Sequence, residues 1–328
     1  MRALKLDLSV PLSVAIPVSK GELLGRVRVT PADLNLCAVS VRNILTPNNG
    51  LIVPVWFDIS ANDKDTDRLA LRRLNVSLDG QVRTFLEFED EIGDSIARHV
   101  WDSGLVTISM LSDMCAKASR GSKLPMLRES LLREGKLRIL ELGCGIGTLG
   151  IGLATILHSC GGERPVDASI LLTDLPDAED RAVANITRFR ESATNRKDIQ
   201  LDYDNLDWED GRKGIFPPKV ESAPWDLVIL SDCTYNVDTL PALVQTLSAL
   251  DAIGGGHGIE QDTHPGLKVL VATKERHSSE RAFFKMMSKA GWSVLERLIL
   301  PLPVLAASSE SIEVYLFGRD ACSDVEQT

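Results

Sequence analysis

From about residue 95 onward, short apolar runs alternate with stretches whose apolar positions recur every three or four residues. Strands that helices cover on both faces read as nearly continuous apolar segments. Strands, several of them of this kind, are predicted at 137–142, 169–174, 198–203, 226–231, 267–273, 292–299 and 312–317, with helices between them at 148–159, 177–191, 238–250 and 279–289. This alternation predicts an α/β fold built on a doubly wound, seven-stranded sheet.

The two ends of the chain depart from this pattern. The last two predicted strands are separated by Pro301, Pro303 and small polar residues rather than by a helix, which predicts an antiparallel last strand at one edge. Before residue 95, short strand-like runs alternate with turns, and Asp79-Gly80 between two such runs predicts a hairpin. We therefore expect a β-rich extension over 1–94, an α/β domain over 95–320 and a disordered tail over 321–328.

Composition narrows the class of protein. The chain has 328 residues, of which 44% are hydrophobic, and a net charge of −10, so it can bury a core but does not resemble a protein that wraps nucleic acid. Six scattered cysteines without a C-x-x-C pair predict reduced thiols and no metal site. No apolar run approaches the ~20 residues that span a bilayer, so we expect no membrane contact. We expect the protein in the cytoplasm, with the nucleus as a further location.

A glycine-rich turn, ELGCGIGTLG at 141–150, gives the strongest local signal. Glycines allow a tight turn and close approach of a ligand, and N–H groups at a helix start favour a carboxylate or phosphate. From Gly145 the string also reads G-x-G-x-x-G, the fingerprint of dinucleotide sites. The turn therefore predicts a nucleotide-like cofactor without saying which, and a structural strand-to-helix turn is the alternative.

Two acidic residues bear on the choice of cofactor. The carboxylate of Glu141 would repel a pyrophosphate but could hold an ammonium group, directly or through water. S-adenosylmethionine has such a group, whereas NAD does not. Asp174 ends the next strand, where it could accept both ribose hydroxyls in either cofactor family. The alternatives are a solvated strand end for Glu141 and a cap on the helix near Pro176 for Asp174.

Five separated segments resemble one family. They are HVWDSGLVTISML (99–111), ELGCGIGTLG (141–150), LLTDLPDAEDRAVANI (171–186), NLDWED (205–210) and WDLVILSDCTY (225–235). In this order they resemble the seven-β-strand (class I) S-adenosylmethionine-dependent methyltransferases. More narrowly they resemble methyltransferase family 16, which is rich in protein-lysine methyltransferases. The likeness covers about residues 95–318, and its D-x-x-Y and Leu-Asp-Trp motifs are more specific than the glycine turn.

The resemblance implies a Rossmann-like methyltransferase sheet and a role for each matched residue. The glycine turn would line the methionine part of the cofactor, Asp174 the ribose, and Asp207 with Trp208 the adenine. Trp101 would lie near the sulfonium, since an aromatic face favours a cation, and Ser231 at the switch point of the sheet. Core packing is the alternative for both tryptophans. The expected cofactor-binding set is Trp101, Glu141, Gly143, Cys144, Gly145, Gly147, Asp174, Asp207, Trp208 and Ser231.

Asp232 and Tyr235 are the candidates for the substrate side. Methyl transfer needs an aligned and neutral nucleophile. Because a free lysine has a pKa of about 10.4, deprotonating it at pH 7 costs a free energy of about 4–5 kcal/mol. Asp232 could attract and orient the ammonium, while Tyr235 supplies an acceptor and an aromatic wall. Helix capping by Asp232 and packing by Tyr235 are the alternatives. His277, near a strand end, could border the site or be a solvated loop residue.

The expected function is lysine methylation of a protein substrate by a monomeric enzyme. A small-molecule N-methyltransferase acting on a nicotinamide-like pyridine, arginine methylation and a Rossmann dehydrogenase are the enzymatic alternatives. A scaffold that has kept the fold but lost transfer is the alternative of another class. An open acidic groove beside Asp232 would favour a protein substrate, and a closed aromatic pocket a small molecule.

Overall fold

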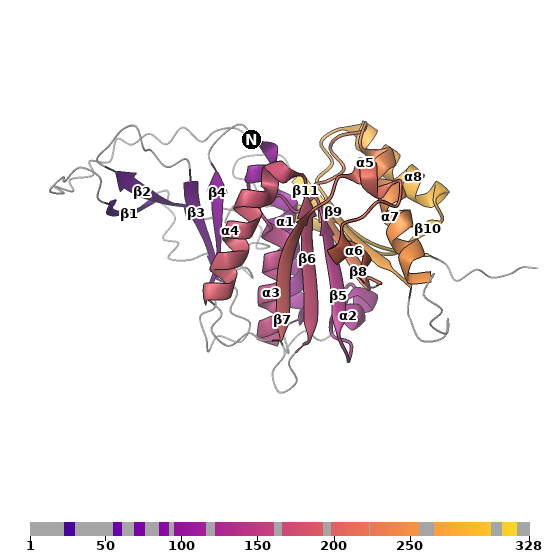
Figure 1. Cartoon of the computed structure of the whole chain (residues 1–328), viewed down its shortest axis with the longest axis horizontal. Helices are drawn as coiled ribbons and strands as arrows, with labels where there is room; N and C mark the ends of the chain where they lie inside the picture. The colour runs from indigo at the N-terminus through magenta and orange to yellow at the C-terminus, as the bar shows by residue number, and fades with distance from the viewer. Residues whose placement is uncertain are drawn as a thin grey trace, which may run out of the picture.

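The computed structural model describes residues 23–29, 55–60, 69–75, 85–91, 95–115, 122–160, 166–192, 198–222, 224–255, 266–302 and 310–319. Its larger sheet has seven strands in the order β10-β11-β9-β8-β5-β6-β7 (Figure 1). Their bounds are β5 Leu137–Leu142, β6 Ala168–Asp174, β7 Ile199–Asn205, β8 Leu227–Ser231, β9 Lys268–Thr273, β10 Trp292–Leu302 and β11 Glu310–Arg319. All seven strands predicted from the apolar runs are present, and this confirms the predicted fold class.

One strand of this sheet, β11, runs opposite to the other six. The pairs β5–β6, β6–β7, β5–β8 and β8–β9 are parallel, whereas β11 runs antiparallel to both β9 and β10. Residues 303–309 are fewer than the dozen or so that a parallel crossover needs, so β11 must return antiparallel. The antiparallel last strand is confirmed. The order of the strands reverses between β5 and β8, and this is the switch point where α/β sheets bind ligands.

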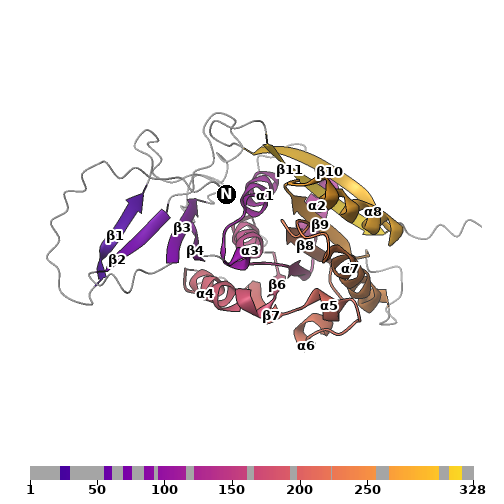
Figure 2. The same ribbon diagram turned by 90° about the horizontal axis from the view of Figure 1, so that it is seen from above.

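Helices cover both faces of the sheet (Figure 2). Successive side chains in a strand point to opposite faces, so Ile139 packs with one layer and Leu140 with the other. The first layer holds α1 Asp102–Cys115, α2 Pro125–Leu131, α3 Thr148–Cys160 and α4 Pro176–Ser192. The second holds α5 Trp208–Gly211, α6 Pro218–Glu221, α7 Leu240–Gly255 and α8 Ala282–Lys289. Short 3-10 turns lie at η3 Ile96–Arg98 and η4 Ser278–Arg281.

A second sheet of four strands precedes the α/β domain. Its order is β1 Leu23–Val29, β2 Val55–Ser60, β3 Leu69–Asn75, β4 Phe85–Glu91, all antiparallel. Pairing of β3 with β4 confirms the predicted hairpin, although Asp79-Gly80 itself lies outside the described residues, as does the predicted tail.

One buried side chain joins this second sheet to the α/β domain. Asn185 of α4 accepts a hydrogen bond from the Glu89 N–H of β4 at 2.7 Å and donates to the Ile146 carbonyl in the glycine turn at 3.0 Å. The residue is fully buried, so these bonds form away from water. The hairpin is thereby fixed to the loop that the sequence marks as the cofactor site. The predicted boundary at residue 94 stays a prediction.

Candidate functional site

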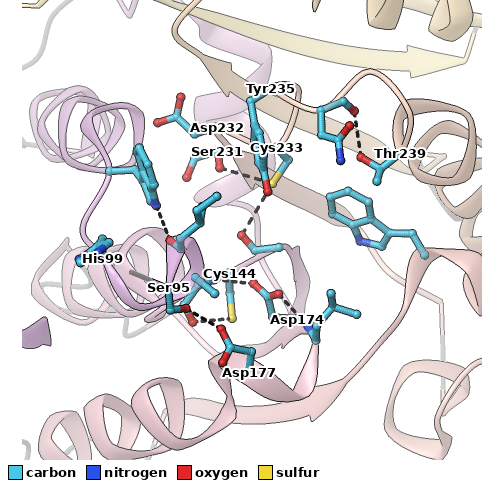
Figure 3. A pocket seen from close by; sticks show the side chains of 18 of the residues that line it. Ser95, His99, Cys144, Asp174, Asp177, Ser231, Asp232, Cys233, Tyr235 and Thr239 are labelled. Carbon is cyan, nitrogen blue, oxygen red and sulfur yellow. Dashed lines mark hydrogen bonds between the residues drawn. The ribbon is translucent and has the colours of Figure 1, made fainter. Parts of the chain in front are cut away.

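A cavity of about 640 Å³ lies at the carboxyl ends of β5, β6 and β8. Ten of the twelve predicted site residues line it: Trp101, Gly143, Cys144, Gly145, Asp174, Asp207, Trp208, Ser231, Asp232 and Tyr235. Asp174 lies at one end of this cavity, and Asp232 and Tyr235 lie at the other (Figure 3). Parallel strands end at the same edge of a sheet, so Gly143, Asp174 and Ser231 meet there although up to 88 positions separate them in the sequence.

The glycine turn presents bare backbone to the cavity. Gly143 and Gly145 have φ of +63° and +54°, the left-handed region that side chains with a Cβ rarely adopt. A Cβ on Gly143 would lie 2.6 Å from the Cys233 sulfur, and one on Gly145 would lie 3.0 Å from the Ala97 carbonyl oxygen. Both positions therefore require glycine for conformation and for space.

Glu141 and Gly147 lie behind the turn and do not line the cavity. The Glu141 carboxylate is 1% exposed and accepts a hydrogen bond from the Gly150 N–H at 2.9 Å, and burial raises its pKa well above the usual range. A Cβ on Gly147 would come within 2.9 Å of Leu172. The structure thus gives both residues supporting positions under the turn, and a direct cofactor contact for either stays a prediction.

Asp174 joins the glycine turn to the end of β6. Its carboxylate accepts hydrogen bonds from the N–H groups of Gly145 and Leu175, each at 2.7 Å. Desolvation nevertheless raises its pKa, because burial penalises the charged form more than these bonds favour it. The alternative role for Asp174 is an N-cap of α4. Such a cap would accept a hydrogen bond from an N–H group inside the first turn of α4, and neither of these two bonds comes from there. Asp174 instead fixes the turn while facing the cavity.

Two tryptophans form walls of the cavity. The Trp101 indole N–H donates to the Ile96 carbonyl at 3.0 Å, which fixes the ring beside η3. Trp208 begins α5, and Asp207 caps that helix by accepting from the Glu209 N–H at 2.8 Å. Trp208 also packs against the second core layer, so its wall is rigid. Flat apolar surfaces of this kind suit a purine base or an alkyl chain.

Asp232 is held in an unusual conformation at the other end. Its φ is +55°, and within the described segments it is the one non-glycine residue with a positive φ. One carboxylate oxygen accepts from the Ser103 N–H in the first turn of α1 at 3.0 Å, and the other pairs with Arg276 at 2.9 Å. The capping alternative therefore describes a real contact, made to a helix distant in sequence.

Tyr235 completes this end of the cavity. Its side chain is large, apolar in part and 49% exposed, and Ser231 lines the cavity at the end of β8. Desolvation raises the pKa of the Tyr235 hydroxyl, so it carries its proton at neutral pH.

Burial likewise raises the pKa of the Cys144 and Cys233 thiols well above their usual range, which leaves them neutral and poorly nucleophilic.

Sequence reasoning missed two parts of the lining. The first is the segment Ser95–His99. Its His99 ring nitrogen lies 3.2 Å from the carboxylate of Asp90, a residue of β4 in the four-stranded sheet. The second is Arg276, which lines the cavity, whereas His277 beside it does not and is exposed. The signal for Arg276 was available, since it follows the carboxyl end of β9 by three residues and such ends face ligands.

These residues fit S-adenosylmethionine. Its size suits a cavity within the range of about 300–1,000 Å³ typical of small-molecule sites. The glycine turn forms a cradle of bare backbone, in which a Cβ on Gly143 or Gly145 would crowd neighbouring atoms. Asp174 offers carboxylate oxygens near a rigid tryptophan wall. Within the described segments, no group of His, Cys, Asp or Glu has the arrangement of a metal site. No helix there is both long and apolar enough to cross a bilayer.

Comparison with known proteins gives two curated relatives of this chain. The chain is 25% identical over 246 residues to UPF0665 family protein C23C4.06c of Schizosaccharomyces pombe, covering 75% of this chain and 62% of that protein. It is 25% identical over 167 residues to protein-lysine N-methyltransferase EFM3 of Chaetomium thermophilum, covering 48% and 41%. The chain thus spans less than two thirds of the length of either relative.

A solved structure and a family add to these relatives. A putative RNA methyltransferase from Pyrococcus horikoshii aligns with 70% of this chain and 90% of its own, at 13% identity and a TM-score of 0.41. The sequence pattern of a family described as lysine methyltransferase matches residues 81–290, well over half of the chain. The chain belongs to this lysine methyltransferase family.

Proposed function

We propose that the protein is an S-adenosylmethionine-dependent N-methyltransferase that methylates a lysine side chain of a protein substrate. One observation carries this proposal: a single cavity combines a glycine cradle and Asp174 at one end with Asp232 and Tyr235 at the other. Membership of the lysine methyltransferase family supports the same reaction. In this proposal the cofactor lies along the cradle and the acceptor nitrogen enters beside Asp232.

The charges around the cavity suit a basic acceptor. Its lining carries five carboxylates, Asp174, Asp177, Asp207, Glu209 and Asp232, against the cationic Arg276 and the titratable His99. Such a site attracts an ammonium group and raises its local concentration. A lysine-bearing segment would therefore be drawn toward the cavity, whereas nucleic acid would be repelled.

The chain's own residues would orient the acceptor rather than act as a strong base. Bound S-adenosylmethionine supplies an electrophilic methyl group, which the amine nitrogen takes as the carbon–sulfur bond breaks. Asp232 would hold the ammonium until it loses its proton to water, at a cost of about 4–5 kcal/mol at pH 7. The Tyr235 hydroxyl keeps its proton, and its oxygen lone pairs could still accept a hydrogen bond from an amine N–H, which would limit the orientation of the amine.

The mouth of the cavity favours a protein over a small molecule. Three apolar side chains that line it are exposed to solvent: Ile96 at 54%, Leu175 at 49% and Tyr235 at 49%. A closed pocket for a pyridine would bury such groups, while a peptide can cover them on binding. We further propose that the enzyme is a monomer of the cytoplasm or nucleus, with residues 1–94 as a substrate-recognition platform.

Transfer of a labelled methyl group tests the proposal. The protein is incubated with tritiated S-adenosylmethionine and cell lysate, labelled proteins are hydrolysed, and the amino acids are separated. We expect label in methyl-lysine and none with Gly145→Arg, which would fill the cradle. Label in methyl-arginine or in a small molecule would replace the lysine assignment. Absence of label together with absence of cofactor binding would favour the scaffold alternative.

A further inference from the structure

Arg276 lies between Asp232 and solvent. Its guanidinium donates a hydrogen bond to the Asp232 carboxylate at 2.9 Å, and the two side chains are 29% and 5% exposed respectively. The guanidinium carbon also lies 5.4 Å from the centre of the Trp101 ring, within the range of a cation–π contact. A cation entering the cavity toward Asp232 therefore meets another cation that already occupies the carboxylate.

Each Asp232 carboxylate oxygen already has a partner, Ser103 for one and Arg276 for the other. The first oxygen accepts the Ser103 N–H at 3.0 Å inside the protein, where the side chain is enclosed. That bond satisfies one of the otherwise unpaired N–H groups at the start of α1, so it is costly to break. The oxygen paired with Arg276 is the one that a substrate ammonium could take.

The backbone around Arg276 is fixed by contacts that do not involve the Arg276 side chain. The N–H groups of Arg276 and His277 both donate to the Glu280 carboxylate at 3.1 Å, and Glu280 is 3% exposed. Among the described residues, the guanidinium has one further hydrogen bond beyond Asp232 and the Trp101 ring, a long one of 3.4 Å to the Lys274 carbonyl. The flexible side chain can thus leave Asp232 while the loop that carries it stays in place.

We propose that Arg276 is a displaceable guard of the acceptor site. It occupies the place on Asp232 that the substrate ammonium takes, so productive binding requires the exchange of one cation for another. This inference rests on the proposed function, because it assumes that the acceptor enters beside Asp232. It adds that the acceptor group arrives there as a primary ammonium. Arg276 acts here as a specificity residue: an acceptor without a positive charge cannot displace it.

Binding of a lysine side-chain analogue tests this exchange without any methyl transfer. The probe is n-butylammonium, titrated into the full chain and followed by NMR of the arginine side-chain N–H signals. In the wild type we expect the Arg276 signal, assigned by its loss in Arg276→Gln, to move as the probe binds. Arg276→Gln should bind the probe about tenfold more tightly, which corresponds to losing one charge-assisted competitor, whereas Arg276→Lys should stay near wild type.

Two further variants make the outcome decisive. Arg281→Gln is the matched control, because Arg281 pairs with Glu275 on the surface and does not line the cavity, and it should leave probe binding unchanged. Asp232→Asn should abolish the Arg276 shift. Equal probe affinity in wild type and Arg276→Gln, or an Arg276 signal that stays fixed at saturation, would overturn the guard. Titration of S-adenosylhomocysteine into the same samples tests the proposed function separately.

Discussion

Substitutions of Asp232 separate its structural role from its proposed chemical role. Asp232→Ala removes the acceptor for the Ser103 N–H, and losing such a cap costs about 1 kcal/mol. It also places alanine at φ +55°, where a Cβ without a polar side chain costs about 1–2 kcal/mol. Together with the lost ion pair to Arg276, which contributes up to about 1 kcal/mol, the predicted loss in the free energy of unfolding is about 2–4 kcal/mol.

Asp232→Asn should behave differently. Asparagine tolerates the left-handed region, and its amide oxygen can still accept the Ser103 N–H. The ion pair with Arg276 is lost, but that arginine is partly exposed and can turn to water, so the cost stays below about 1 kcal/mol. The asparagine variant should therefore fold almost as stably as the wild type while lacking the negative charge.

Urea unfolding and activity measured on both variants check this reasoning. We expect Asp232→Asn to keep its stability and its affinity for S-adenosylhomocysteine but to lose methyl transfer by at least roughly 100-fold, the scale of a misplaced acceptor. If the asparagine variant is as unstable as the alanine variant, the account of the cap and of the backbone is wrong. If it is stable and fully active, Asp232 does not orient the acceptor.

Three more predictions follow from the site. Gly145→Ala should weaken S-adenosylhomocysteine binding, because its Cβ would press on the Ala97 carbonyl, whereas Gly135→Ala, at φ +89° with nothing within 4 Å, should pay a similar backbone cost and leave calorimetric binding unchanged. Cofactor affinity should fall as the pH drops through the raised pKa of Asp174, since protonation removes an acceptor for the ribose, and Asp174→Asn should bind weakly with a flat pH profile; a flat profile in the wild type would contradict this. Asn185→Ala should lower the free energy of unfolding by about 1–3 kcal/mol by leaving the Glu89 N–H and the Ile146 carbonyl unpaired in the core, and unchanged urea unfolding would refute the anchoring of the hairpin.

The fold could be predicted because its signals are local. Several strands of the large sheet are nearly continuous apolar runs, and two of them, β6 and β8, end in Asp174 and Ser231, which the topology brings to one edge. The glycines of the turn are visible in the sequence, and three of them, Gly143, Gly145 and Gly147, take the positive φ that glycine favours. Parallel strands then gather these positions at the switch point without any knowledge of individual contacts.

The partners of the polar side chains could not be predicted in this way. Asp232 bonds Ser103, 129 residues away, and pairs with Arg276, 44 residues away, and neither contact follows from periodicity. Glu141 illustrates the same limit, because its place under the turn depends on how α3 packs on β5. Burial of these groups is a property of the assembled layers, so the electrostatics of the site follow only from the structure.

Calorimetric titration with S-adenosylhomocysteine, with NADH as the control, tests the central claim most directly. The cradle, Asp174 and the tryptophan walls predict micromolar binding of S-adenosylhomocysteine and none of NADH. The same titration on Gly145→Arg should show no binding, because that side chain would fill the cradle. Binding of NADH instead would indicate a dehydrogenase, and binding of neither ligand would reduce the assignment to a statement about fold.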